Sequence, residues 1–185
     1  MSVSFEEAQA VLARAECLHS VDEINVAFDQ MADAISQKIG DCEPLVICVM
    51  QGGLIPTGLL LSRLSFPLQI DYLHASRYGG KTRGGELDWK VLPHHELKGR
   101  TVLLVDDIHD EGVTLKAIIE YCKEHGAETV LSAVLINKLH ERKAAAPADF
   151  VGLDVVDRYL FGYGMDYKGH LRNAPGIYAV CSDDE

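Results

Sequence analysis

The chain has 185 residues, of which 48% are apolar, and a formal net charge of −11 at pH 7. This length suits one compact domain over residues 1–185 with a core of its own and leaves little room for a second domain. The charge argues against nucleic acid as a partner, because a duplex would meet net repulsion unless the few cations gathered on one face.

Cysteine usage and the first residues indicate the compartment. The five cysteines are an odd number with no C-x-x-C pair, which predicts reduced thiols rather than a disulfide framework or a zinc site. The start of the chain lacks a basic region followed by an apolar one, and no apolar run approaches 18 residues. We therefore expect a soluble, cytoplasmic protein with no membrane partner.

Two helices are predicted near the start of the chain. The pairs Ser4 with Glu7 and Ser20 with Glu23 both match the S-x-x-E capping box, and each pair precedes helical apolar spacing. In the second stretch one apolar stripe should lie on the core: Ile24, Ala27, Phe28, Met31 and Ile35. Gly40 predicts the end of this helix.

Strands and helices then alternate along the chain. Strands are predicted over residues 45–50, 68–75, 101–105 and 129–136, from continuous apolar runs or from alternation of apolar and polar residues. Helices are predicted over about 55–64 and after Gly112. This order favours an α/β fold, a mostly parallel twisted sheet flanked by helices, with the site beyond the carboxyl ends of the strands. Residues 76–85 lose all periodicity and are predicted to form a mobile loop.

The segment from Val102 to Leu115 carries the chemistry. It places four acids at a strand-to-helix turn, followed by Gly112 and Thr114; the acids are Asp106, Asp107, Asp110 and Glu111. Such a turn presents free backbone amides to an anion, and glycine lets the backbone approach a phosphate closely. The G-x-x-x-x-G-K-[ST] pattern is absent, which excludes the usual nucleoside-triphosphate loop. Taken singly, each acid could instead end a strand or cap a helix.

Taken together, this constellation resembles the phosphoribosyl-pyrophosphate signature of the type I phosphoribosyltransferases. Over nearly its whole length the chain also resembles the hypoxanthine-guanine phosphoribosyltransferases. The matching segments are Cys48–Gly53, Arg77–Gly79, the acidic turn, Asn137 with Lys138, Asp157–Tyr167, and Arg172 with Asn173. The resemblance implies the type I fold with a small hood built from the chain termini. It also implies transfer of phosphoribosyl from phosphoribosyl pyrophosphate to a 6-oxopurine, a need for Mg²⁺, and a homodimer or homotetramer.

The resemblance further implies a role for each matching residue. Ribose and phosphate binding fall to Asp106, Asp107, Asp110, Glu111, Gly112, Val113 and Thr114, with Asp110 as the catalytic acid/base facing purine N7. Pyrophosphate binding falls to Met50, Gln51, Gly52, Arg77, Tyr78 and Arg172, and the Met50–Gln51 peptide is expected to be cis. Purine binding falls to Lys138, Tyr159, Leu160 and Asp166. Metal binding falls to Asp106, Asp107 and Asp166.

Three positions depart from the pattern of many relatives, namely Gln51, Arg77 and Glu111. Gln51 replaces a cation, a loss that Arg77 would offset, and Glu111 adds a negative charge that should turn to solvent while its amide faces the phosphate.

Other residues suggest further hypotheses. A metal site built on His94, His95 and His140 is disfavoured, because adjacent residues of an extended chain point to opposite faces. His109 is expected to face solvent, and Trp89 to anchor a loop or to contact another subunit. A second function class is a regulatory protein of the same fold that binds RNA or purine nucleotides, for which a basic face is expected.

Overall fold

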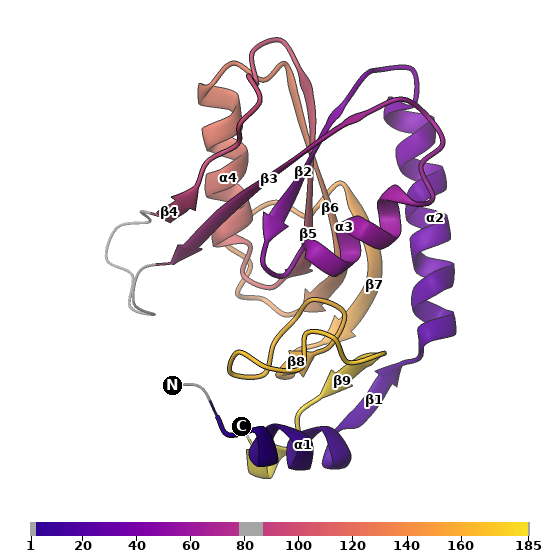
Figure 1. Ribbon diagram of the computed structural model, residues 1–185, viewed down its shortest axis with the longest axis vertical. Coiled ribbons are helices and arrows are strands. Elements are labelled where there is room, and N and C mark those ends of the chain that lie inside the picture. Colours follow the sequence, from indigo (N-terminus) through magenta and orange to yellow (C-terminus); the bar gives the residue numbers. More distant parts are fainter. Residues whose placement is uncertain (1–2, 78–86, 185) are drawn as a thin grey trace.

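The structure, a computed structural model, describes residues 3–77 and 87–184 and contains two sheets (Figure 1). The larger sheet has six strands in the order β4-β3-β2-β5-β6-β7. Their bounds are β2 (Leu45–Met50), β3 (Gln69–Arg77), β4 (Leu87–Val91), β5 (Thr101–His109), β6 (Thr129–Leu139) and β7 (Phe150–Val156). All neighbours pair in parallel except β4, which runs antiparallel to β3 at the edge. The carboxyl ends of five strands therefore lie at one end of the sheet.

Helices cover both faces of this sheet (Figure 1). On one face lie α2 (Val21–Ile39) and α3 (Leu54–Leu61), against side chains such as Val46 and Leu103. On the other face α4 (Val113–Glu124) packs against side chains such as Ile47 and Leu104. Successive side chains of a strand point to opposite faces of the sheet. A strand that helices cover on both faces therefore needs apolar residues at every position, which explains the unbroken apolar runs.

Local sequence signals explain how the first helices begin. Ser20 and Glu23 form a complete capping box at α2, with each side chain bonded to the other's backbone. At α1 (Phe5–Arg14) the Ser4 side chain accepts from the Glu7 amide at 3.1 Å. The predicted stripe of α2 is buried along its whole length. The helix is thus held by its cap and by its apolar face.

The second sheet forms a hood over the carboxyl ends of the strands (Figure 1). Its order is β1-β9-β8, from β1 (Glu16–His19), β9 (Ile177–Ala179) and β8 (Leu160–Phe161). A separate apolar cluster joins Val11 of α1 to Phe161 and Tyr167. Arg14 forms an ion pair with Asp184, in the 3-10 turn Ser182–Asp184, with a nitrogen-to-oxygen distance of 2.6 Å. The hood therefore unites both ends of the described chain, as expected.

Several predicted boundaries are wrong. The strand predicted over 101–105 runs on to His109, the one predicted to end at 136 runs to Leu139, and α3 ends at Leu61. Trp89 lies in β4 opposite Ala75, at the edge of the sheet, with its ring 4.6 Å from that of Tyr121; a contact with another subunit stays a prediction. Of the loop predicted over 76–85, the first two residues belong to β3 and the others lie outside the described residues. Within the described ranges, the helices are too short or too polar to cross a bilayer.

Candidate active site

A cleft with a volume of about 390 Å³ lies at the carboxyl ends of β2, β3 and β5, beside the start of α4. Its lining includes most of the predicted phosphate and pyrophosphate residues: Met50, Gln51, Gly52, Asp106, Asp107, Asp110, Glu111, Gly112, Val113, Thr114 and Arg172. A larger cavity of about 610 Å³ lies between α4 and residues 143–149, and its lining does not include Asp106, Asp107 or Asp110. The chemistry of the lining therefore selects the smaller cleft.

The turn into α4 is shaped for an anion. Gly112 is the N-terminal cap of this helix and has a φ of +78°, a conformation that disfavours other residues. A Cβ added there would lie 2.5 Å from Nε2 of His109, so space also requires glycine. The Ala144 amide donates to the Glu111 carbonyl at 2.8 Å and holds the turn from behind. The first amides of α4 have no partner within the helix and are available to a phosphate.

Two adjacent acids from β5 line the cleft below this turn. Asp107 is 8% exposed, and its amide donates to Oδ1 of Asp106 at 2.9 Å. Burial and the charge of Asp107 raise the pKa of Asp106 well above its ordinary value, and burial also raises the pKa of Asp107. The guanidinium of Arg172 is 3.9 Å from Asp107, too far for a hydrogen bond. The pair is thus short of positive charge, and a bound cation fits it.

Arg172 links these acids to Asp166. Its Nη2 lies 2.6 Å from Oδ1 of Asp166, whose Oδ2 accepts from the Gly169 amide at 2.7 Å. Among the residues that the structure describes, Asp106, Asp107 and Asp166 do not form a cluster of three close ligands; the group that does is Asp110, His140 and Asp157. The Lys138 ammonium lies beside the carboxylates of Asp110 and Asp157, so we describe these four residues as an ion-pair cluster. The predicted metal ligands remain a prediction.

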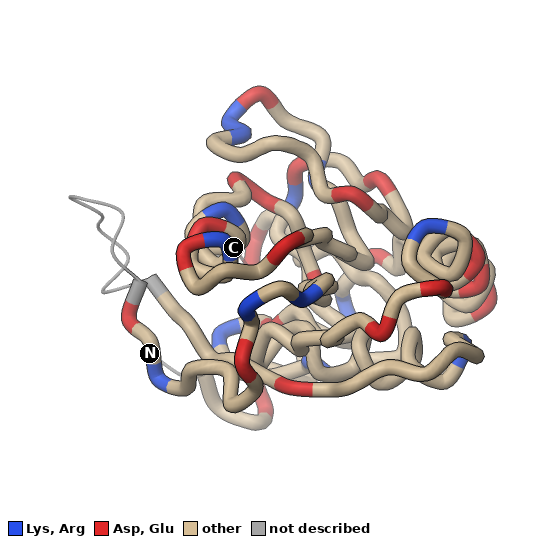
Figure 2. Tube along the Cα trace, turned by 90° about the horizontal axis from the view of Figure 1, so that it is seen from above, with Lys and Arg blue, Asp and Glu red and all other residues tan. Residues whose placement is uncertain are grey.

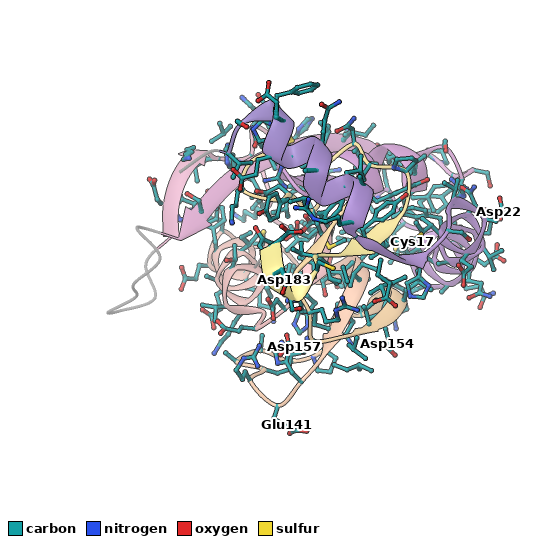
Figure 3. All side chains as sticks on the ribbon, turned by 90° about the horizontal axis from the view of Figure 1, so that it is seen from below. Cys17, Asp22, Glu141, Asp154, Asp157 and Asp183 are labelled. Atoms are coloured by element: carbon teal, nitrogen blue, oxygen red, sulfur yellow. The ribbon has the colours of Figure 1, made fainter. Side chains whose placement is uncertain are left out.

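Asp110 joins the cleft to this ion-pair cluster. Its Oδ2 lies 3.2 Å from Nζ of Lys138, and its Oδ1 lies 2.6 Å from Nε2 of His140. Lys138 also lies 3.6 Å from Asp157, which Arg142 contacts at 2.8 Å. Figure 3 labels Asp157, at the end of β7, and Glu141, at the tip of the loop that follows β6. Burial acts to raise the pKa of Asp110, but the His140 and Lys138 contacts outweigh it and leave this pKa below its ordinary value.

The loop after β2 approaches Asp107 through glycine. The Met50–Gln51 peptide is cis, as expected. A Cβ on Gly52 would lie 2.2 Å from Oδ2 of Asp107, and a Cβ on Gly164 would lie 2.1 Å from the Gly52 carbonyl. The hood, this loop and the acid pair are therefore stacked without side chains between them.

Tyr159 and Leu160, which were predicted to bind the purine, are not part of the cleft lining. The Tyr159 ring is 5.6 Å from that of Tyr167, and its hydroxyl accepts from the Lys168 amide at 3.2 Å. Leu160 is buried in β8 opposite Ala179. Arg77 ends β3, and Tyr78 lies outside the described residues. Stacking of Tyr159 on a base and the role of the Leu160 backbone remain predictions.

Three histidines at or near the cleft have surroundings that the sequence did not indicate: His74 was not predicted at all, His109 was predicted wrongly to face solvent, and His140 was weighed only as a metal ligand. His74 lines the cleft from β3 together with Ser76, a position that the end of a parallel strand beside β2 could have suggested. His109 does not face solvent, because it is 1% exposed and Lys143 covers it, donating to its carbonyl at 2.6 Å. Burial and then the Lys143 charge lower the pKa of His109, so this imidazole is neutral. His140 touches Asp110, although its sequence neighbours gave no signal of this contact.

Comparisons with known proteins show which family this chain resembles. Residues 18–168 match the phosphoribosyl transferase domain family. The chain is 32% identical over 163 residues to a Bacillus subtilis protein named hypoxanthine-guanine phosphoribosyltransferase, covering 86% of this chain and 89% of that protein. It is 31% identical over 161 residues to a Tritrichomonas foetus protein named hypoxanthine-guanine-xanthine phosphoribosyltransferase, covering 86% and 88%. The crystal structure of a Staphylococcus aureus hypoxanthine phosphoribosyltransferase superposes with a TM-score of 0.86 at 25% identity, covering 91% of this chain and 92% of that one.

Proposed function

The chain belongs to the phosphoribosyltransferase family, and from this premise we propose that its cleft transfers the 5-phosphoribosyl group of phosphoribosyl pyrophosphate to hypoxanthine or guanine. The products are IMP or GMP and pyrophosphate, and the protein is an enzyme of purine salvage. The observation that carries the choice of base is the pair formed by Lys138 and Asp110, 3.2 Å apart.

This pair matches one edge of a 6-oxopurine. A lysine ammonium donates hydrogen bonds and a carboxylate accepts them. On a 6-oxopurine, O6 is an acceptor and lies beside N7, which carries the proton that the base must lose. Adenine instead presents a donor at N6, which would face the Lys138 donor. The pair therefore favours 6-oxopurines over adenine.

The acids and amides of the cleft suit the sugar chemistry. As the bond between the anomeric carbon and pyrophosphate breaks, positive charge grows on the ribose and negative charge on the leaving group. We assign Asp106 and Asp107 to the ribose and the amides of residues 110–114 to its 5-phosphate. Arg172 and the backbone of residues 50–52 then face pyrophosphate. Each charge that develops has a fixed partner of opposite sign.

Mg²⁺ fits this cleft, because Asp106 and Asp107 supply hard oxygen ligands and a cation would offset the cost of two adjacent buried carboxylates, the cost that raises their pKa values. Asp106, Asp107 and Asp166 would hold it, directly or through water. When bound, the ion neutralises charge on the pyrophosphate oxygens.

Asp110 takes the proton from N7 of the incoming base. Its lowered pKa keeps it ionised near neutral pH and therefore able to accept that proton. Tyr159 stacks on the base, and the Leu160 backbone meets its edge. The homodimer or homotetramer that the resemblance implies stays a prediction.

A single assay separates this function from the alternative of a non-catalytic regulator. Pyrophosphate release is measured with Mg²⁺, the activated sugar and each of hypoxanthine, guanine, xanthine and adenine. Turnover is expected with hypoxanthine or guanine and not with adenine. Turnover with xanthine as well would give the broader base range that the name of the Tritrichomonas foetus relative states. No turnover with any base rejects the enzyme. Figure 2 shows, for the described residues, Lys and Arg positions separated by Asp and Glu, which offers little to an RNA ligand.

A further inference from the structure

His140 holds one oxygen of the carboxylate that accepts the purine proton. Its side chain is 5% exposed and sits just after β6, with Nε2 2.6 Å from Oδ1 of Asp110. The other oxygen, Oδ2, faces Lys138 at 3.2 Å. The two oxygens of Asp110 therefore have different partners, one an imidazole and the other an ammonium.

The hydrogen bonds around His140 assign its tautomer. The Arg142 amide donates to Nδ1 of His140 at 3.1 Å, so Nδ1 carries a lone pair. The hydrogen of a neutral imidazole must then be on Nε2, where it points at Asp110. A cationic imidazole would set its Nδ1–H against the Arg142 N–H. His140 is accordingly a neutral donor with a fixed orientation.

The charged and titratable groups around Asp110 come from three segments. They are His109 and Glu111 beside it, Lys138, His140, Arg142 and Lys143 from β6 and the loop that follows, and Asp157 from the end of β7. Lys143 is directed to His109 and Asn137, and Arg142 to Asp157. Within this set, Lys138 and His140 contact the Asp110 carboxylate directly.

We infer that His140 is a positioning residue, whose Nε2–H fixes Oδ1 of Asp110 so that Oδ2, beside Lys138, meets the N7–H of the purine. This rests on the proposed function, in which Asp110 is the base. In the step itself the N7–H bond breaks, its electron pair stays in the ring, and an O–H bond forms on Oδ2. His140 keeps its own proton throughout.

The test compares His140→Ala with His140→Gln, whose side-chain amide can donate to Oδ1 again. Loss of the donor is expected to lower kcat by about tenfold, a part of what a positioned base contributes, with KM for the activated sugar changed less than about twofold. Because Asp110 then loses a contact that lowers its pKa, the acid limb of the kcat profile moves to higher pH. His140→Gln should recover most of the rate and the original limb. His125→Ala, an exposed histidine on Tyr121 at the end of α4, is the matched control and should change neither.

An unchanged rate and pH profile in His140→Ala would overturn the inference while leaving the proposed function intact. Inactivity of the unmodified enzyme with every base would instead reject the proposed function. The nitrogen-15 chemical shifts of His140 can be measured in the unmodified protein, so this test depends neither on enzyme activity nor on whether a variant folds. They should report hydrogen on Nε2 and a bare Nδ1, and hydrogen on Nδ1 would contradict the assignment.

Discussion

Replacing Asp106 by asparagine is expected to stabilise the ligand-free protein and to abolish its activity. Asparagine keeps the Oδ1 atom that accepts the Asp107 amide, but it removes a half-buried charge beside another carboxylate. Each unit by which the pKa of an acid is raised on folding corresponds to about 1.4 kcal/mol of lost stability once the acid is ionised. Stabilising replacements of single residues usually yield about 0.5–2 kcal/mol. For a chain of this size, where 1 kcal/mol shifts Tm by about 2–4 °C, we therefore expect Tm to rise by about 1–8 °C.

The sign of the pH dependence identifies the cause. The folded-state pKa of Asp106 is raised, so between the unfolded value of about 3.9 and the folded value the folded chain holds a proton that the unfolded chain has released. The stability of the unmodified protein therefore falls as pH rises through this window, whereas asparagine does not titrate. The gain from Asp106→Asn should be small below about pH 4, where Asp106 is protonated in both the folded and the unfolded state, and complete above the folded pKa.

Thermal or urea unfolding of both proteins at about pH 5 and about pH 8 measures this gain. Glu120→Gln, which removes an exposed acid from α4, serves as the control for net charge. A second readout is stabilisation by Mg²⁺, which should be weaker in the variant. Equal or lower stability of Asp106→Asn at pH 8, or a gain that does not shrink toward pH 5, would refute the argument.

Three further substitutions test the catalytic base, the preference for 6-oxopurines and the pyrophosphate loop. Asp110→Asn should lower kcat by about 100-fold or more, while calorimetry finds binding of the activated sugar nearly unchanged; equal loss of both would make Asp110 structural. Lys138→Met removes the donor for O6 and should reduce the preference for hypoxanthine over adenine, whereas Lys123→Met on the exposed side of α4 should not. Gly52→Ala forces a Cβ to within 2.2 Å of Oδ2 of Asp107, so KM for the activated sugar should rise or the protein should lose about 1–3 kcal/mol of unfolding free energy. An alanine variant with unchanged kinetics and stability would show that the loop has room to move.

Signals within a few residues of each other predicted the local structure well. The Ser20–Glu23 capping box forms because its two partners are three residues apart, and the apolar stripe of α2 needed only a surface to cover. Gly112 was found because a turn between a strand and a helix requires its conformation. These features depend little on the rest of the fold.

Features that depend on distant residues were predicted poorly. Residues 87–91 alternate apolar and polar as a strand does, but the pairing of Trp89 with Ala75 and its contact with Tyr121 depend on distant residues. His109 is buried because Lys143, 34 residues later, covers it. His140 reaches Asp110 only because β5 and β6 pair in register and bring the ends of both strands together. Spacing along one segment does not contain this information, so the partners of Asp110 needed the structure.

The hood closes through a pairing between two distant strands, with Glu16 opposite Ala179. During synthesis β1 leaves the ribosome long before β9 exists, so it stays without a partner until nearly the whole chain has emerged. Contacts of such high sequence separation form slowly, since a long loop must close before they yield any stabilisation. The central sheet, whose parallel neighbours are closer in sequence, can assemble first. Nascent chains stalled before residue 177 should therefore have a folded sheet and an open cleft.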